Sequence, residues 1–201
     1  MISGHRRRAL SALGAIAAIA AGGIFGGVAF AQALDASDLL GTLARVVRST
    51  ATFEETRTIA ALTAPIVRRG TLRYVRPDQL EMVVTAPVPE RIEISGDNVT
   101  MESRSGTRRV RLTQFPAAAI WVESVRATLA GDQQALNRYF RVRTNGRMAA
   151  WTLELTPSDN ELADVVSRIV ITGTQDLVNR IEIEERSGDR SVMVIAASDR
   201  R

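Results

Sequence analysis

The sequence predicts an α+β fold that is mainly antiparallel β: a strongly curved, incompletely closed barrel of roughly eleven strands, with helices over its concave face. Apolar and polar residues alternate with period two over most of the chain, as in strands with one buried and one exposed face. Turn residues divide these stretches into roughly eleven strands, enough to curl a sheet towards a barrel. Two helices interrupt the strands mid-chain, and the concave face of the sheet is the surface on which they can bury their apolar sides.

The clearest alternation lies between Gly70 and Met101. Leu72 and Tyr74 alternate with polar residues before the break at Arg76-Pro77-Asp78. The apolar residues that repeat at every second position after this break are Leu80, Met82, Val84, Ile92 and Ile94. With a proline-containing break and a Gly96-Asp97 turn between its strands, this stretch is typical of an antiparallel meander.

The N-terminal segment has the features of a secretory signal peptide. Three arginines, Arg6 to Arg8, precede an apolar run rich in Ala and Gly, and Ala31-Gln32-Ala33 supplies small residues for cleavage. We therefore expect residues 1–33 to be removed and residues 34–201 to form one mature domain. An uncleaved membrane anchor is the alternative, because Ala9 to Ala33 is 25 residues and about 20 cross a bilayer. The adjacent arginines also suit twin-arginine export, so the export route stays open.

Helices are expected in four places. Asp35–Ser49 has an apolar stripe and Asp35 or Ser37 as its N-cap. Pro116–Ala130 carries Ile120, Trp121 and Leu129 at helical spacing. The two short helices are expected over Asp132–Phe140 and from the capping box Ser158–Glu161.

The remaining strands follow from alternation bounded by turn residues. They are expected over Phe53–Leu62, Ile66–Val75, Thr107–Thr113, Phe140–Thr144, Trp151–Leu155, Val166–Thr172, Val178–Glu185 and Ser191–Ala196. Turns are expected around Ala64-Pro65, at Asn145-Gly146, at Gly173 and at Ser187-Gly188-Asp189.

The composition excludes most catalytic chemistry from the mature chain. The only histidine, His5, lies in the segment to be removed, and the chain has neither Cys nor Lys. Catalysis through histidine or cysteine, zinc bound by histidine, Schiff bases and disulfides are therefore excluded. Catalysis by two carboxylates stays open in principle, because the chain has 22 acidic residues. We expect no enzyme, no catalytic residue, no cofactor and no metal.

The net charge gives no reason to expect nucleic-acid binding. The full chain carries a net charge of +4, but removal of residues 1–33 removes three of its 26 arginines and none of its 22 acids, which leaves about +1.

The order of strands and breaks around Arg76-Pro77 resembles the centre of the LolA-like family, the periplasmic carriers of outer-membrane lipoproteins. Phe53-Glu54-Glu55 stands where that family usually has Phe, any residue and Gln, and Pro116–Phe140 falls where its lid helices fall. The resemblance covers essentially the whole mature chain and is closest to a shorter branch of the family.

This resemblance implies an apolar cavity beneath a movable helical lid, to which the N-terminal helix also belongs. Arg76 corresponds to the family's functional arginine, which hydrogen-bonds to the backbone of the lid, and we expect it to close the lid. The residues expected to line the lipid-binding cavity are Leu72, Tyr74, Leu80, Met82, Val84, Ile92, Ile94, Ile120, Trp121, Leu129, Leu153, Leu155, Ile169 and Ile171.

The function implied is that of a periplasmic carrier that moves a lipoprotein or lipid from the inner to the outer membrane. Its partners would be the cargo, an inner-membrane extraction complex and an outer-membrane acceptor, and we expect a monomer. Glu55 in place of the family's Gln leaves the cargo open among a lipoprotein, a glycolipid and another acyl lipid. The alternative is a lipid-sensing or scaffold domain with a filled core and no role in transport.

Overall fold

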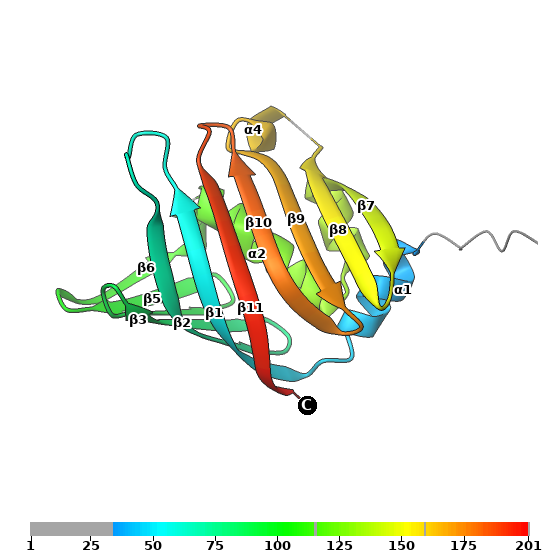
Figure 1. The fold of residues 1–201 in the computed structure, drawn as a ribbon, viewed down its shortest axis with the longest axis horizontal. Coiled ribbons are helices and arrows are strands. Elements are labelled where there is room, and N and C mark those ends of the chain that lie inside the picture. The colour runs from blue at the N-terminus through cyan, green and yellow to red at the C-terminus, as the bar shows by residue number, and fades with distance from the viewer. Residues whose placement is uncertain (1–33, 115, 159, 201) are drawn as a thin grey trace, which may run out of the picture. The chain divides into compact units, whose positions relative to one another are not determined.

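The computed structural model describes residues 34–114, 116–158 and 160–200, which form one antiparallel sheet of eleven strands with helices against one face (Figure 1). The expected signal peptide, residues 1–33, lies outside the described residues. The strands are β1 Arg48–Thr58, β2 Ile66–Val75, β3 Gln79–Ala86, β4 Glu90–Ser95, β5 Asn98–Ser103, β6 Gly106–Arg111, β7 Phe140–Arg147, β8 Ala150–Pro157, β9 Val166–Thr174, β10 Leu177–Glu185 and β11 Arg190–Arg200. The helices are α1 Ala36–Leu43, the 3-10 turn η1 Leu112–Gln114, α2 Pro116–Ala130, α3 Gln133–Tyr139 and α4 Asn160–Ala163.

The strand order confirms the predicted fold class. The order is β6-β5-β4-β3-β2-β1-β11-β10-β9-β8-β7, so the first and last strands pair and join two meanders into one sheet. The edge strands β6 and β7 do not pair with each other, and the sheet is not closed into a barrel. The connection between β6 and β7 contains α2 and α3, which pack on the face of the sheet away from the viewer in Figure 1.

The register places the predicted apolar positions on one face. Leu72 lies opposite both Ala51 and Met82, and Met82 lies opposite Ile92. On the other half of the sheet, Ile171 lies opposite Ile181 and Leu153. Because neighbouring residues along a strand point to opposite faces, these pairings form two apolar rows on the inner face, one in each half of the sheet.

The N-terminal helix is shorter than expected. It begins after the N-cap Asp35, whose carboxylate accepts from the Ser37 backbone N–H at 2.7 Å, and it ends at Leu43 rather than Ser49. Arg48 and Ser49 instead pair with β2, so strand pairing overrides the helical spacing at this end. Three leucines of α1, Leu39, Leu40 and Leu43, are buried in the core.

Two of the predicted turns are wrong, for one shared reason. Gly146 lies inside β7, whose turn is at Met148-Ala149, and Gly173 lies inside β9, whose turn is at Gln175-Asp176. A Cβ at Gly173 would lie 2.2 Å from the Trp151 ring, and the indole N–H donates to the Gln175 carbonyl at 2.9 Å. Gly173 therefore leaves room for a buried tryptophan, and a Cβ at Gly146 would meet the Ala150 carbonyl oxygen at 2.2 Å.

Gly131 allows α1 and α2 to approach each other closely. It follows α2 with φ +72°, and a Cβ there would lie 2.6 Å from both the Ala44 Cβ and the Leu40 carbonyl oxygen. None of the described helices is long and apolar enough to cross a membrane.

We predict that Gly131→Ala destabilises the domain by about 2 kcal/mol or more, because alanine resists a left-handed backbone and its methyl group would push α1 away from α2. A domain of this size should then melt about 4 to 8 °C lower. Gly41→Ala is the matched control. Gly41 lies within α1, and a methyl group added there would have no neighbouring atom within 4 Å, so this variant should gain about 0.5 to 1 kcal/mol. Equal melting temperatures for the two variants would contradict the close helix contact.

Candidate functional site

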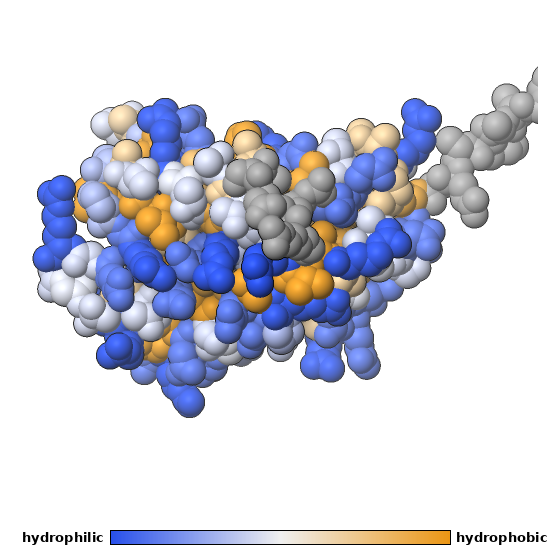
Figure 2. Space-filling model, turned by 90° about the horizontal axis from the view of Figure 1, so that it is seen from below, coloured by the Kyte–Doolittle hydropathy of each residue, from blue (hydrophilic) through white to orange (hydrophobic). Residues whose placement is uncertain are grey.

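A cavity of about 150 Å³ lies between the inner face of the sheet and α2. It lies towards the end of the sheet at which β1 begins and β11 ends, the lower end in Figure 1. Seen from below, apolar side chains are exposed between polar ones on this side of the molecule (Figure 2). The residues that line the cavity are Val46, Ser49, Ala51, Leu72, Arg73, Tyr74, Leu80, Glu81, Met82, Ile92, Ile94, Val125, Thr128, Leu129, Ile171, Asp176, Leu177, Val178, Ile181, Met193 and Ile195.

The expected cavity residues fall into two groups. Eight of them line the cavity: Leu72, Tyr74, Leu80, Met82, Ile92, Ile94, Leu129 and Ile171. Four others, Val84, Leu153, Leu155 and Ile169, are at most 2% exposed and pack in the core cluster away from the cavity. Ile120 packs against the same cluster, and the side chain of Trp121 lies outside the described residues. The binding role of all fourteen stays a prediction.

Sequence reasoning left several lining residues out of the expected set. Met193 and Ile195 of β11 lie opposite Glu55 and Phe53 of β1, respectively. Ile181 of β10 lies opposite Met193. Ile181 alternates with polar neighbours, as do the strands that were included, whereas the neighbours of Met193 and Ile195 are apolar and give no such signal. Val125 on α2 belongs to the apolar stripe of that helix.

Tyr74 brings a polar group into the rim of the cavity. Its side chain is 4% exposed and its hydroxyl lies 3.4 Å from the Pro77 carbonyl oxygen. Burial raises the pKa of the Tyr74 phenol, so the ring is neutral at physiological pH and adds no charge to the cavity.

Arg76 connects the β2–β3 turn to the end of α1. One guanidinium nitrogen, Nη1, donates to the carbonyl of Ala44, the C-cap residue of α1. The Arg76 backbone N–H also donates to the Val47 carbonyl at 3.0 Å. Carbonyl groups at a helix C-terminus attract cations because of the helix dipole. Arg76 is therefore placed to hold α1, while its role in closing a lid stays a prediction.

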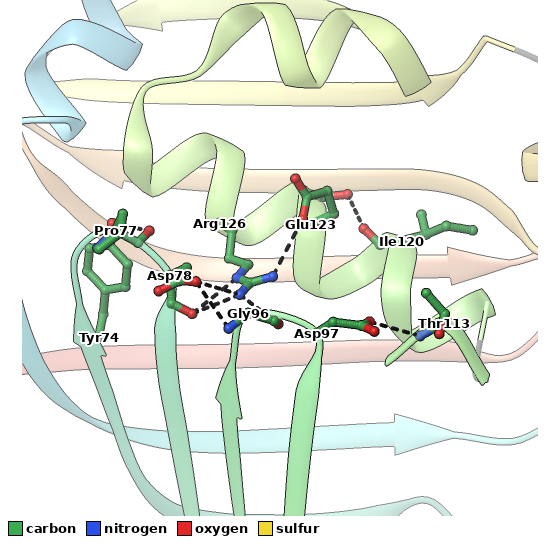
Figure 3. A network of polar contacts seen from close by, with 10 residues as sticks. Tyr74, Pro77, Asp78, Gly96, Asp97, Thr113, Ile120, Glu123 and Arg126 are labelled. Carbon is green, nitrogen blue, oxygen red and sulfur yellow. Dashed lines mark hydrogen bonds and ion pairs between the residues drawn. The ribbon is translucent and has the colours of Figure 1, made fainter. Parts of the chain in front are cut away.

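Arg126 on α2 makes a larger set of contacts that sequence reasoning missed (Figure 3). Its guanidinium donates to the Asp78 carbonyl from Nε at 3.2 Å and from Nη2 at 3.0 Å, and Nη2 also donates to the Gly96 carbonyl at 2.9 Å. The Asp78 carboxylate lies 3.5 Å from Nη2 and accepts from the Gly96 backbone N–H at 3.1 Å. Glu123 lies 3.7 Å away on the same helix.

These contacts fasten the middle of α2 to two hairpin turns. Asp78 belongs to the β2–β3 turn and Gly96 to the β4–β5 turn, and the Arg126 side chain is only 11% exposed. No sequence signal distinguishes Arg126 from a solvent-exposed helical arginine, because its acceptors are carbonyls about 30 and 48 residues away along the chain.

Glu55 lies on the inner face of β1, at the end of the apolar surface away from the cavity. It is 6% exposed, and its carboxylate accepts from Arg68 Nε at 2.7 Å and from the Ser191 hydroxyl at 2.6 Å. Next to it on the same face, Phe53 already belongs to the core cluster. A carboxylate buried with an arginine partner replaces the neutral amide expected at this position, so this end of the inner face is charged.

The described residues contain no group of three or more His, Cys, Asp or Glu side chains that could hold a metal ion. The cavity itself is lined mainly by apolar side chains, together with the polar residues Ser49, Arg73, Tyr74, Glu81, Thr128 and Asp176.

We predict that Arg126→Leu loosens α2. The variant leaves two backbone carbonyls without a charged donor, and hydrogen bonds to charged groups contribute about 1.5 to 3 kcal/mol each. Amide hydrogen exchange in α2 should become at least tenfold faster, while exchange in β8 and β9 should stay unchanged.

Glu123→Gln is the control for that experiment, since it removes only the distant and half-exposed partner of Arg126. Its exchange should match the unmodified protein. If the amide hydrogens of α2 exchange at the same rate in Arg126→Leu and in Glu123→Gln, Arg126 does not hold the helix in place.

Comparison with known proteins gave one family match and several distant structural matches. The family model for outer membrane lipoprotein carrier protein LolA-like matches residues 28–200. A search of curated proteins found no significant match. The crystal structure of a LolA superfamily protein from Nitrosomonas europaea has 13% sequence identity and a TM-score of 0.45, and the match covers 84% of this chain and 93% of that one.

Two further solved structures are similar at the same level. The Pseudomonas aeruginosa MucA/MucB complex matches with 13% identity and a TM-score of 0.46 over 83% of this chain and 58% of that one. A putative outer membrane lipoprotein-sorting protein domain from Vibrio parahaemolyticus matches with 13% identity and a TM-score of 0.42 over 83% of this chain and 93% of that one.

Proposed function

We propose, from the premise that the chain belongs to the LolA-like family of outer-membrane lipoprotein carriers, that it holds the acyl chains of a lipoprotein or lipid in its cavity. In this role it moves the cargo through the periplasm from the inner to the outer membrane. The observation that carries the proposal is the aliphatic cavity between the curved sheet and α2. We propose further that an inner-membrane extraction complex loads the monomeric carrier and an outer-membrane acceptor unloads it.

The energetics of acyl chains explain why such a cargo needs a carrier. Each buried methylene contributes about 0.8 kcal/mol, so a chain of about 16 carbons is held in a bilayer by about 13 kcal/mol. Spontaneous desorption is therefore too slow to supply another membrane, and the carrier must offer comparable burial and still release its cargo.

The small volume of the cavity supports the interpretation that the described conformation is a closed one. About 150 Å³ is well below the roughly 300 to 1,000 Å³ of pockets that enclose a small molecule. Displacement of α2 would uncover the apolar surface that Val125 and Leu129 now cover. Cargo and helix then compete for the same surface. The balance between the closed state and the cargo-bound state depends on how strongly the sheet binds the helix and how strongly it binds the cargo.

The test of the proposal is native mass spectrometry of the protein purified gently from the periplasm, with extraction of bound lipid. We expect a stoichiometric ligand that bears acyl chains. Ile92→Glu places a charge on a half-buried cavity residue of β4 and should reduce the occupied fraction at least tenfold, because a carboxylate is costly to bury against an acyl chain.

Ser95→Glu is the matched control. It adds the same charge to the same strand, but on the exposed outer face, and should leave the ligand bound. A protein that carries no ligand and also refuses added lipids would refute the carrier function.

Arg76 provides a second prediction. In Arg76→Leu the contact to the Ala44 carbonyl is lost, so closure competes less well with bound cargo. We expect the variant to bind lipid but to transfer it to acceptor membranes at least several-fold more slowly than the unmodified protein. Unchanged transfer kinetics would exclude Arg76 from lid closure.

A lipid-sensing or scaffold domain is the second candidate, and one observation favours it. The core residues Leu153, Leu155 and Ile169 are fully buried, so one half of the inner face is already filled. A scaffold would keep a dry and ligand-free interior, whereas a sensor would form a stable complex with a signalling partner. The mass spectrum of the gently purified protein separates both from a carrier.

A further inference from the structure

Two neighbouring loops at one end of the sheet are apolar and contain no charged residue. They are the β1–β2 loop, residues 59–65, and the β3–β4 loop, residues 87–89, and we refer to them as the apolar loops. The uncharged stretches extend into the flanking strands, over residues 58–67 and 82–89. Leu62, Ile66 and Val88 are 50%, 37% and 60% exposed, and they make up three of the six large exposed apolar residues in the described part of the chain.

The apolar loops lie at the same end of the first meander. Every second turn of a meander lies at the same end, so the β1–β2 and β3–β4 loops share one end and the β2–β3 and β4–β5 turns share the other. Ile66, the first residue of β2, and residues 87–89 line one hollow of about 270 Å³, so the two loops are neighbours. Figure 1 shows the β1–β2 loop projecting from the upper end of the sheet.

The other end of these strands has a different character. Its turns carry Asp78 and Asp97, and Arg126 of α2 donates to the carbonyls of Asp78 and Gly96. The polar turns thus hold a helix, whereas Leu62 and Val88 in the apolar loops remain at least half exposed. Packing within the domain does not account for these apolar side chains, and a cluster of exposed apolar residues marks a site of interaction.

The charged residues at the base of the apolar loops pair with one another. Arg68 donates to Glu55 and Arg69 donates to Glu54, both at 2.7 Å. These pairs leave the surface around the loops nearly neutral, so a charged partner would gain little from it. The apolar loops therefore suit an apolar partner better than an ionic one.

The backbone of the apolar loops has few free donors to remove from water. Three of the ten loop residues are prolines, which have no N–H group. The N–H groups of Ala60 and Leu62 already donate, to the Asp189 carboxylate and to the Ile59 carbonyl, each at 2.9 Å. Since an unpaired N–H group is costly in an apolar medium, this arrangement lowers the cost of moving the loops into one.

We propose that the apolar loops insert into the surface of a lipid bilayer. The energetic hot spots of protein interfaces are enriched in Trp, Tyr and Arg, while Leu and Val are under-represented there. The apolar loops contain none of the three enriched residue types. A bilayer takes up aliphatic side chains at the boundary between headgroups and acyl chains without a groove of matching shape, so it fits these loops better than a protein does.

Insertion of the apolar loops turns the cavity away from the bilayer. Ala51 lines the cavity, and Thr58 ends β1 next to the β1–β2 loop. The seven residues between these positions span roughly 23 Å along the strand. The cavity therefore stays accessible from water while the protein is docked. This contact goes beyond the carrier function, because it uses the other end of the sheet and requires no cargo.

The test is co-sedimentation of the purified protein with phosphatidylcholine vesicles at low and at high salt concentration. We expect binding at both concentrations, since salt screens ionic contacts and leaves apolar ones in place. Leu62→Gln and Val88→Gln should each weaken binding about three- to tenfold, because each removes a half-exposed aliphatic side chain from the contact. The double variant L62Q/V88Q should bind at least tenfold more weakly than the unmodified protein.

Val194→Gln is the matched control. Val194 is 52% exposed and lies on the outer face of β11, since its strand neighbours Met193 and Ile195 line the cavity. The substitution removes a similar exposed aliphatic side chain without touching the apolar loops, so it should leave vesicle binding unchanged.

A fluorescent label reports which end of the sheet enters the lipid. The chain has no cysteine, so Thr63→Cys in the β1–β2 loop and Ser95→Cys at the far end of β4 each provide a single labelling site. An environment-sensitive fluorophore at position 63 should shift to shorter wavelength when vesicles are added. The same fluorophore at position 95 should not shift.

Four results would overturn the proposal. They are no binding to vesicles, loss of binding at high salt, equal losses in Val88→Gln and Val194→Gln, and equal fluorescence shifts at positions 63 and 95. The first result would leave a protein as the partner of the apolar loops. None of these results bears on whether the cavity holds an acyl ligand, which mass spectrometry decides separately.

Discussion

The structure depends on an apolar sheet face that the sheet cannot cover by itself. Closure into a barrel would bury this face, but β6 and β7 do not pair with each other, and the helical connection between them covers the face instead. Burial of apolar surface contributes about 25 cal/mol per Å², so exposure of the whole face to water would be prohibitive. The helices must therefore cover this face. Apolar packing is not specific to a helix, so another apolar group can occupy the same surface.

Hydrogen bonds from two arginines also hold the helices over the sheet. Arg76 and Arg126 donate mainly to backbone carbonyls at hairpin turns and at the end of α1, and such bonds contribute about 1.5 to 3 kcal/mol each. The four bonds of Arg76 and Arg126 therefore sum to about 6 to 12 kcal/mol, whereas an acyl chain of about 16 carbons gains about 13 kcal/mol on full burial. Under the proposed carrier function, cargo would displace the helix, and the two arginines would restore the closed state once the cargo leaves.

Sequence periodicity predicts most of this fold because strand parity is a local property. The alternation of Leu72, Met82, Ile92 and Ile171 places them on one face whatever the partner strands are, and the register confirms that placement. Gly173 misled the turn prediction because a Cβ there would meet the Leu177 carbonyl oxygen at 1.9 Å and the ring of Trp151 at 2.2 Å, and both contacts arise only once the strands are paired. The role of Arg126 could not be predicted, because its acceptors are backbone carbonyls. Every residue has a backbone carbonyl, so the sequence does not mark which ones an arginine will contact. The filled half of the inner face, around Leu153 and Leu155, could not be separated from the cavity, since both halves share the same alternation.

The most direct test of the competition between α2 and cargo is a distance measurement between the helix and the sheet. The chain has no cysteine, so cysteines introduced at Glu123 on α2 and at Glu93 on the outer face of β4 carry the only two spin labels. Pulsed electron resonance should give a short and narrow distance distribution for the empty protein and a longer one when an acyl ligand is bound. An unchanged distribution in protein with stoichiometric ligand would show that α2 does not yield to cargo, and would contradict the account.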